Sequence, residues 1–478
     1  VANGPVTLKW SARQFAEAHI GGRFVVRKRG DAGYLPLSES ARPGDVYDLA
    51  MRVAGHGDRQ GGTSEGSDTG SGLNWVRVEY GALEEIRTAV NDLLERIFVC
   101  ERLTVAAGTG SMALDQAVSC IDRTAIDRGD KAAVLASISA ANDALAGLDD
   151  LFKRYSICLT ANAHIDMAWL WDREETKQVC HDTFRSVLNL MNEYPDFIFS
   201  QSQAAAFAWV EEYWPEMFEE IRARVAEGRW EIVGGMWVEP DCNLPSGESF
   251  VRQVVYGKRY FMEKFGVDVT LGWNPDSFGY NYGMPQVYKK CGINAFLTQK
   301  LTWNDTNVWP LRAFWWESAD NSRIFSYFPT DYTGKVLSNG LIQDLAFMMT
   351  ATGAKRTCHL FGIGDHGGGP TRDMLDRADK LSALQPFPRV RHQRMRDFID
   401  ELQAELEDKG GAPVYRGELY LEYHRGTFTS QAAIKKGNRD AERLLRRLEI
   451  FATAAARLGA AYPAEAIDGL WKTTLFNQ

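Results

Sequence analysis

A histidine and an aspartate two residues apart are the first candidates for chemistry in this sequence. His164 and Asp166 follow the short apolar run Ser156–Thr160, which predicts a buried strand. Residues two apart in an extended segment point the same way, so the imidazole and the carboxylate can face one point and bind a metal ion. The alternative, a histidine at a strand end that is hydrogen-bonded to the aspartate, stays open.

A second carboxylate stands in a rigid turn. Asp276 follows the predicted strand Val267–Trp273 and lies between Pro275 and Gly279, which suits a side chain that must keep one pose. The alternative is an aspartate that caps the next helix. We consider it weaker because residues 279–284 separate Asp276 from that helix.

A third strand end carries an acidic residue among glycines. Asp365 and His366 follow the predicted strand Cys358–Ile363, and glycine occupies position 364 and positions 367–369. Glycines around such a pair let the backbone come close to a ligand. A phosphate-binding loop is the alternative, and it is disfavoured because the Lys-Ser/Thr ending of that motif is missing.

Together these groups match what the cleavage of a glycosidic bond requires. One carboxylate attacks the anomeric carbon, and another protonates the leaving oxygen. A metal ion held by oxygen and nitrogen ligands can also bind sugar hydroxyl groups. Beside such a site Trp169 could be the apolar floor for a sugar ring, and its alternative is a core residue.

Short β-rich runs must position these residues, and amphipathic helices alternate with the runs from residue 156 onward. This alternation predicts an α/β domain with a parallel sheet, open or closed into a barrel, whose active site lies beyond the carboxyl ends of the strands. The predicted strands are Ser156–Thr160, Phe197–Gln201, Trp230–Val233, Val267–Trp273, Ala295–Gln299, Ile324–Phe328 and Cys358–Ile363.

Changes in composition and in hydrophobic pattern divide the chain into four regions. Residues 1–80 are predicted to be a mixed β region with a Gly/Ser-rich loop at 54–72, and residues 81–155 a helical segment. Residues 156–415 form the α/β catalytic domain, and residues 416–478 form the start of a helical bundle.

Composition and charge exclude two classes of partner. The 478-residue chain has a formal net charge of −9 and no dense run of Lys and Arg, so we expect neither nucleic acid nor a membrane surface as the partner. It contains no run of about 18 apolar residues, and residues 1–10 lack the features of a secretory signal. The seven cysteines are scattered singly, which argues against a disulfide framework. We therefore predict a cytoplasmic protein.

Five motifs occur in the order found in α-mannosidases of glycoside hydrolase family 38. Over residues 156–478 the chain resembles that family, and five ordered motifs are far more specific than any single one. The motifs are Ala163–Trp169, Gly234–Asp241, Trp273–Tyr280, Gly364–Pro370 and Glu418–Thr427.

The resemblance implies a barrel-like (β/α)7 catalytic domain, one zinc ion and a retaining double displacement that removes terminal α-linked mannose. By motif, His164, Asp166 and Asp276 would bind the zinc. Asp276 would also be the nucleophile, and Asp365 the general acid/base. The residues that the resemblance assigns to substrate contact or to bracing the site are Trp169, Phe278, Tyr423, His424 and Arg425.

Two features depart from the family. Its fourth zinc ligand is a histidine in a segment that would begin where this chain ends, at Gln478, and its β-sandwich domains would follow. We therefore expect the 478-residue chain to bind zinc weakly and to be poorly active or inactive. Residues 1–150 carry no motif of the family.

Two alternative functions stay open. A metal on His164 and Asp166 with Asp365 as a base would suit a zinc-dependent, polysaccharide deacetylase-like hydrolase. An inactive mannose-binding homologue is the non-enzyme alternative, and it is disfavoured because both Asp276 and Asp365 are present. The expected partner is an α-mannoside oligosaccharide or glycan, and a homo-oligomer is left open.

Overall fold

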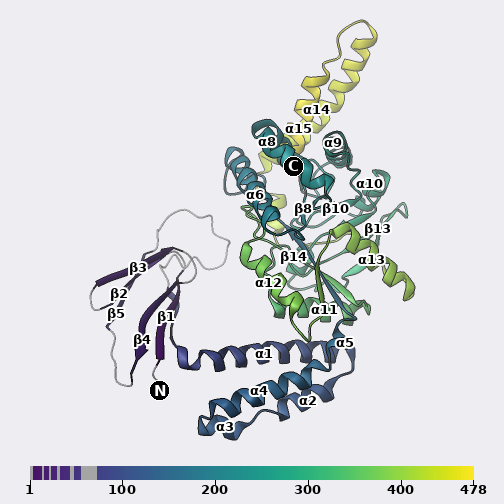
Figure 1. The fold of residues 1–478 in the computed structure, drawn as a ribbon. Coiled ribbons are helices and arrows are strands. Elements are labelled where there is room, and N and C mark those ends of the chain that lie inside the picture. Colours follow the sequence, from purple (N-terminus) through teal and green to yellow (C-terminus); the bar gives the residue numbers. More distant parts are fainter. Residues whose placement is uncertain (1–3, 13–14, 21–22, 30–32, 43–47, 55–72) are drawn as a thin grey trace. The chain divides into compact units, whose positions relative to one another are not determined.

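The computed structural model describes residues 4–12, 15–20, 23–29, 33–42, 48–54 and 73–478 (Figure 1). The chain forms two compact units. The first comprises Val1–Phe98 and Met112–Ala146, and the second comprises Val99–Ser111 and Gly147–Gln478. The Gly/Ser-rich loop predicted at 54–72 lies, from residue 55 onward, outside the described residues.

The first unit begins with two small antiparallel sheets, in the orders β4–β1–β6 and β3–β2–β5. Leu8, Ala18 and Leu35 form their buried centre. The strands are β1 (Gly4–Ala12), β2 (Phe15–Ile20), β3 (Arg23–Arg29), β4 (Gly33–Ala41), β5 (Leu49–Ala54) and β6 (Leu73–Tyr80). The helices that follow are α1 (Gly81–Ala107), α2 (Ser111–Ser119), α3 (Arg123–Arg128) and α4 (Lys131–Ala146).

The second unit is built on two mainly parallel sheets. One has the order β14–β7–β8–β9 with β15 also paired to β7, and the other has the order β10–β11–β13–β12–β16, in which only β12 and β13 pair antiparallel. Their strands are β7 (Ser156–Asn162), β8 (Phe199–Gln201), β9 (Trp230–Ile232), β10 (Leu271–Trp273), β11 (Ala295–Leu297), β12 (Ala313–Glu317), β13 (Arg323–Tyr327), β14 (Arg356–Phe361), β15 (Arg389–His392) and β16 (Val414–Arg416).

Each of the seven strands predicted from the sequence contains or overlaps one strand of these sheets, and the α/β class with a parallel sheet is confirmed. Strands β12, β15 and β16 were not predicted. Two contacts link the two sheets: the amide of Gly234 donates to the carbonyl of Leu271 (2.8 Å), and Gly334, in the loop after β13, forms a parallel bridge with Phe361 of β14. Closure into a seven-stranded barrel stays a prediction.

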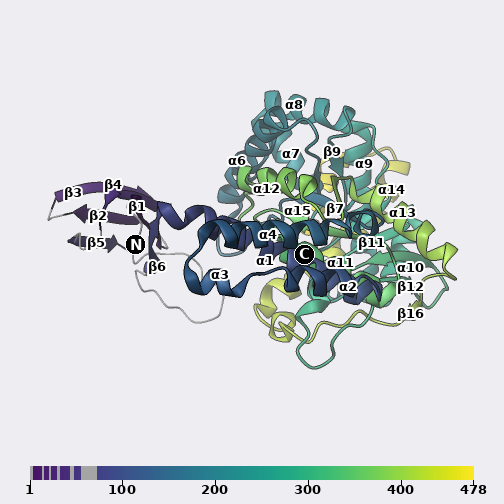
Figure 2. The same ribbon diagram turned by 60° about the horizontal axis from the view of Figure 1, so that its bottom comes forward.

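Helices surround the strands of this unit (Figure 2). Every residue of β7 after Ser156 is buried, as expected for a parallel strand covered on both faces. Helix α6 begins at a cap in which Asp172 accepts from the amide of Glu175, and α9 ends at Gly266 in the left-handed conformation. The helices are α5 (Asp149–Phe152), α6 (Arg173–Glu193), α7 (Ala204–Tyr213), α8 (Pro215–Ala226), α9 (Gly247–Phe265), α10 (Met284–Lys290), α11 (Ser338–Thr352), α12 (Arg372–Ala383) and α13 (Met395–Asp408).

The prediction of a helical C-terminal region is confirmed, although it begins later than the predicted residue 416, because residues 417–424 are not helical. Short 3-10 turns at Arg425–Phe428 and, earlier, at Lys300–Trp303 lie beside the site described below. Helices α14 (Ala432–Arg457) and α15 (Ala464–Phe476) pack beside α9. Among the residues that the structure describes, no helix has the length and apolar character needed to cross a membrane.

Candidate functional site

Two of the sequence motifs meet because their strands are neighbours. Strands β7 and β14 run parallel in register, with Ala161 opposite Phe361. Beyond the strand ends, Ile165 and His366 form an antiparallel bridge, and the amide of Asp166 donates to the carbonyl oxygen of Asp365 (3.0 Å). The sheet therefore brings His164 and Asp166 together with the loop that carries Asp365.

Glycine is required where this loop passes close to its neighbours. A Cβ atom on Gly362 (φ +136°) would lie 2.1 Å from the carbonyl oxygen of Asn162, and one on Gly367 (φ +74°) would lie 2.4 Å from the hydroxyl of Thr183. Asp365 itself has φ +67°, a conformation that costs energy in a residue other than glycine. The surroundings therefore hold the backbone of Asp365 in an uncommon conformation.

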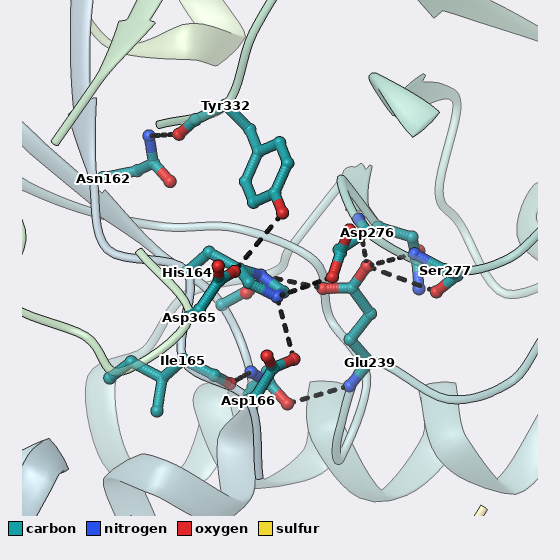
Figure 3. Close-up of polar contacts among 12 residues, drawn as sticks. Asn162, His164, Ile165, Asp166, Glu239, Asp276, Ser277, Tyr332 and Asp365 are labelled. Carbon is teal, nitrogen blue, oxygen red and sulfur yellow. Dashed lines mark hydrogen bonds and ion pairs between the residues drawn. The ribbon is translucent and has the colours of Figure 1, made fainter. Parts of the chain in front are cut away.

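Four predicted residues form one cluster (Figure 3). His164, Asp166, Asp276 and Asp365 each offer a ligand atom, and these atoms all lie within 4.8 Å of one another. Nε2 of His164 is 3.2 Å from Oδ1 of Asp166 and 3.5 Å from Oδ2 of Asp276. The chain thus gathers its three candidate metal ligands and its two candidate catalytic carboxylates at one point.

Glu239 adjoins this cluster, although no role was predicted for it. It follows β9, and its buried carboxylate accepts hydrogen bonds from the amides of Asp276 (2.7 Å) and Ser277 (3.0 Å). Its other oxygen lies 3.4 Å from Nδ1 of His164. Figure 3 shows the imidazole of His164 with carboxylates on both of its sides.

Lys300 is a buried cation of the site, and it was also not predicted. It follows β11 and is only 2% exposed. Its ammonium group forms an ion pair with Oδ1 of Asp276 and lies 3.5 Å from the centre of the Trp303 ring, a cation–π contact. Burial of a lysine is favourable only with such partners, so Lys300 and Asp276 depend on each other.

Tyr332 braces Asp365 from another direction. Its hydroxyl donates to Oδ1 of Asp365 (3.3 Å), and its ring packs edge-on against the imidazole of His164, with ring centres 5.1 Å apart. The backbone of Tyr332 is held by Asn162, whose side-chain amide donates to its carbonyl oxygen (3.0 Å). Tyr332 is nearly buried, so the hydroxyl is fixed in place.

The electrostatics of the site separate the two candidate catalytic carboxylates. Burial by itself raises the pKa of Asp276, but the His164 imidazole and then the Lys300 ammonium outweigh it and hold that pKa well below its usual range. Burial raises the pKa of Asp365 above its ordinary value, and it raises the pKa of Glu239 to about 7. The pKa of Asp276 is thus lowered while that of Asp365 is raised, and pKa values shifted in opposite directions are what a nucleophile and an acid require.

The donor set fits a divalent metal ion. One imidazole nitrogen and three carboxylates offer atoms within 4.8 Å of one another, and nitrogen and oxygen ligands of this kind suit a borderline-hard metal. Carboxylates so close together repel one another unless a cation lies among them. Lys300 supplies one positive charge, at Asp276. The side chains that together could hold a metal ion are those of His164, Asp166, Asp276 and Asp365.

A cavity of about 580 Å³ opens beside the cluster. Trp169 and Phe278 line it, and residues of α14 and α15, among them Ile434 and Phe476, contribute to its wall. Trp169 is 46% exposed, so it is not a core residue, and its ring is available to a ligand. A volume of this size with aromatic walls accommodates a small ligand such as a sugar ring.

The motif at residues 418–427 lies against the same wall. The ring of His424 contacts that of Phe278, with centres 4.7 Å apart, and the rings of Tyr423 and Trp303 are 6.4 Å apart. Arg425, in contrast, donates through its side chain to the carbonyl oxygen of Glu422, three residues earlier in the chain (2.8 Å). His424 and Tyr423 therefore extend the aromatic wall, while Arg425 braces the backbone.

Glu422 fixes this wall to the loop that follows Lys300. Its carboxylate accepts from the amides of Asp305 (3.1 Å), Thr306 (2.7 Å) and Asn307 (2.9 Å). A carboxylate that accepts from consecutive amides fixes the path of a loop. Here it fixes residues 305–307, which follow the 3-10 turn Lys300–Trp303.

Sequence signals for the missed residues exist. Lys300 follows β11 at its carboxyl end, where the other site residues also follow their strands, and Glu239 belongs to a motif that the sequence analysis identified without assigning it a role. Tyr332 follows β13 in the same way. The position of a polar residue after a parallel strand was thus the common signal.

Comparisons with known proteins identify two family models along the second unit. The Glycosyl hydrolases family 38 N-terminal domain matches residues 154–418, and the Alpha mannosidase middle domain matches residues 422–478. Together they cover the region of the predicted resemblance, which they confirm.

Curated relatives agree with these models. The chain is 40% identical to human Alpha-mannosidase 2C1 over 329 residues, which cover 68% of this chain and 31% of the relative. It is 36% identical to the Alpha-mannosidase of Saccharomyces cerevisiae over 329 residues, 66% of this chain and 30% of the relative. The match thus spans about a third of the length of these relatives.

A solved structure shares the fold. The crystal structure of an alpha-mannosidase from Enterococcus faecalis superposes with a TM-score of 0.60 and 23% sequence identity, covering 68% of this chain and 38% of that one.

Proposed function

This chain belongs to glycoside hydrolase family 38, and from that premise we propose that it supplies the catalytic site of a retaining, exo-acting α-mannosidase. The substrate is a terminal α-linked mannose on an oligosaccharide or glycan. Residues 156–415 are the catalytic domain in this proposal, and residues 416–478 are the start of the helical bundle that forms one wall of the substrate cavity.

The observation that carries the proposal is the separation of the two catalytic carboxylates. Oxygen atoms of Asp276 and Asp365 lie within 4.8 Å of each other. Retaining glycosidases place their carboxyl groups about 5–5.5 Å apart, whereas inverting enzymes need roughly 6.5–9.5 Å to admit a water molecule. The short separation therefore supports attack by a carboxylate rather than by water.

The two carboxylates then have distinct tasks. Asp276, kept ionised beside Lys300, attacks the anomeric carbon and forms a β-mannosyl ester, while Asp365 gives its proton to the leaving oxygen. In the second half Asp365 takes a proton from water, whose oxygen displaces the Asp276 carboxylate with overall retention. Tyr332 keeps Asp365 in position through its hydroxyl group.

His164, Asp166 and Asp276 are the residues that would hold a zinc ion. When bound, zinc acts as a Lewis acid that binds sugar hydroxyl groups and helps to orient the ring. Trp169 and Phe278 provide the apolar surfaces against which the mannose ring packs.

Hydrolysis of 4-nitrophenyl α-mannoside and metal content together test the proposal. Both are measured for the 478-residue chain and for a version extended past Gln478 to the length of its relatives. We expect one zinc and hydrolysis in the extended version, and the loss of hydrolysis in its Asp276→Ala variant. A fluorinated mannosyl fluoride should label Asp276 covalently, which a deacetylase-like hydrolase would not permit. An extended protein that binds no zinc and leaves the mannoside intact would refute the mechanism.

A further inference from the structure

Glu239 joins the two halves of the candidate site through its two oxygen atoms. Oε1 accepts from the amide of Asp276 (2.7 Å), from the amide of Ser277 (3.0 Å) and from the hydroxyl of Ser277 (3.2 Å). Three donors on one oxygen fix the turn that presents the Asp276 side chain. The conformation of the nucleophile's backbone therefore depends on Glu239.

The other oxygen faces the histidine of the cluster. Oε2 of Glu239 is buried, makes no hydrogen bond, and lies 3.4 Å from Nδ1 of His164. Nε2, the second nitrogen of that ring, points instead to Asp166 and Asp276. Without a metal, Nε2 hydrogen-bonds the carboxylate of Asp166 (3.2 Å). A metal ion at Nε2 would require the ring proton on Nδ1, and the carboxylate of Glu239 beside Nδ1 favours that tautomer.

Gln203, between β8 and α7, links Glu239 to the motif Ala163–Trp169 and acts as a strap between them. The amide of Glu239 donates to the side-chain oxygen of Gln203 (3.0 Å), and the side-chain nitrogen of Gln203 donates to the carbonyl oxygen of Ile165 (2.8 Å). Gln203 has φ +68°, a conformation that a residue other than glycine keeps only when its surroundings enforce it. The strap ties Glu239 to the segment that contains His164.

We propose that Glu239 is a positioning residue with two tasks. One oxygen holds the backbone turn of Asp276, and the other keeps the ring proton of His164 on Nδ1 when a metal is bound. One side chain thus aligns the metal ligand with the nucleophile. This rests on the proposed function for the roles of His164 and Asp276. Glu239 acts through these two residues rather than on the substrate.

The first test is the zinc affinity of the Glu239→Gln variant, measured by competition with a chromophoric chelator. Glutamine keeps an acceptor oxygen for the two amides, but it places an NH2 group against the Nδ1–H of His164. We expect zinc affinity to fall by about 10- to 100-fold, the usual effect of losing a carboxylate behind a metal-bound histidine. Glu231→Gln is the matched control: Glu231 is also buried, but it accepts from the amides of Met395 and Arg396 away from the cluster, so zinc affinity should not change.

The second test needs no metal. Hydrogen exchange of the peptide that contains Asp276 and Ser277 should be faster in Glu239→Ala than in the unaltered chain, and close to normal in Glu239→Gln, because only alanine removes the acceptor. Far-UV circular dichroism confirms that each variant is folded.

The outcomes separate the inference from the function on which it rests. Zinc affinity in Glu239→Gln equal to that of the unaltered chain would overturn the role at His164. Unchanged exchange in Glu239→Ala would overturn the role at Asp276. If the unaltered chain and its extended version take up no zinc, the metal part of the proposed function fails, and the exchange experiment still decides whether Glu239 holds the nucleophile's turn.

Discussion

Azide should distinguish the two catalytic carboxylates by the stereochemistry of its product. The variants are Asp276→Gly and Asp365→Gly, made in the form of the protein that hydrolyses aryl α-mannosides. Removing Asp276 opens space on the β face of the anomeric carbon, opposite the leaving group, so azide attacks there and gives the β-mannosyl azide. Removing Asp365 leaves the ester on Asp276 intact, and azide then displaces it from the leaving-group side to give the α-mannosyl azide.

The oxygens of Asp276 and Asp365 lie within 4.8 Å of each other, so one substrate can contact both carboxylates. The expected loss of rate follows from the role of each carboxylate. Loss of the general acid should lower kcat/KM for 4-nitrophenyl α-mannoside by about 10²- to 10⁴-fold. It should affect 2,4-dinitrophenyl α-mannoside far less in the first step, because that leaving group needs little proton transfer. Azide should then accelerate turnover of the Asp365→Gly variant on this activated substrate.

The assay is release of dinitrophenol with and without azide, followed by proton NMR of the mannosyl azide. Glu231→Gln serves as the control, since Glu231 lies outside the site and its loss should leave the kinetics unchanged. If Asp365→Gly yields the β-azide, or loses activity on both substrates equally, the assignment of acid and nucleophile is wrong.

Three further substitutions test other contacts of the structure. Lys300→Met removes the ammonium partner of the largely buried Asp276 carboxylate but leaves His164 beside it, so we expect the free energy of unfolding in urea, without metal, to fall by about 1–3 kcal/mol; no measurable loss would contradict this. Tyr332→Phe removes the hydroxyl that contacts Asp365, so hydrolysis of 4-nitrophenyl α-mannoside should fall by about tenfold, the equivalent of one hydrogen bond, while the dinitrophenyl substrate is little affected. An equal loss on both would indicate a merely structural role. Glu231 accepts from the first two amides of α13, and Glu231→Gln leaves a buried donor unpaired there, so it should destabilise the fold by about 1–3 kcal/mol with KM unchanged, as measured by urea unfolding and steady-state kinetics. Unchanged stability would show that Glu231 does not stabilise the start of α13.

Local patterns in the sequence were sufficient to predict the cluster itself. His164 and Asp166 are two residues apart in an extended segment, and Asp276 and Asp365 each follow a strand within a turn of Pro or Gly. Because the carboxyl ends of parallel strands meet on one side of a sheet, residues with this signal had to lie close together. The alternation of strands and helices fixed the class of fold for the same reason.

Tertiary packing determines what the sequence could not predict. A lysine is ordinarily exposed, and Lys300 is buried only because Asp276 and Trp303 surround its ammonium group. Strand β12 pairs antiparallel with β13, and so does not follow the βαβ pattern from which the other strands were predicted. The place of Lys300 after β11 could have indicated a site residue, but its burial and its partners depend on contacts far along the chain.

The role of a buried glutamate in this protein is decided by its neighbours. Glu231, Glu239 and Glu422 each use their carboxylate to hold consecutive backbone amides, so all three organise a helix start, a turn or a loop. Glu231 accepts with both oxygens, and so does Glu422. Glu239 alone of the three keeps one oxygen without a hydrogen bond, and that oxygen faces the ring of His164. The same structural device thus serves the fold at two positions, and at the third it also connects the backbone of the nucleophile to the histidine that would bind the metal.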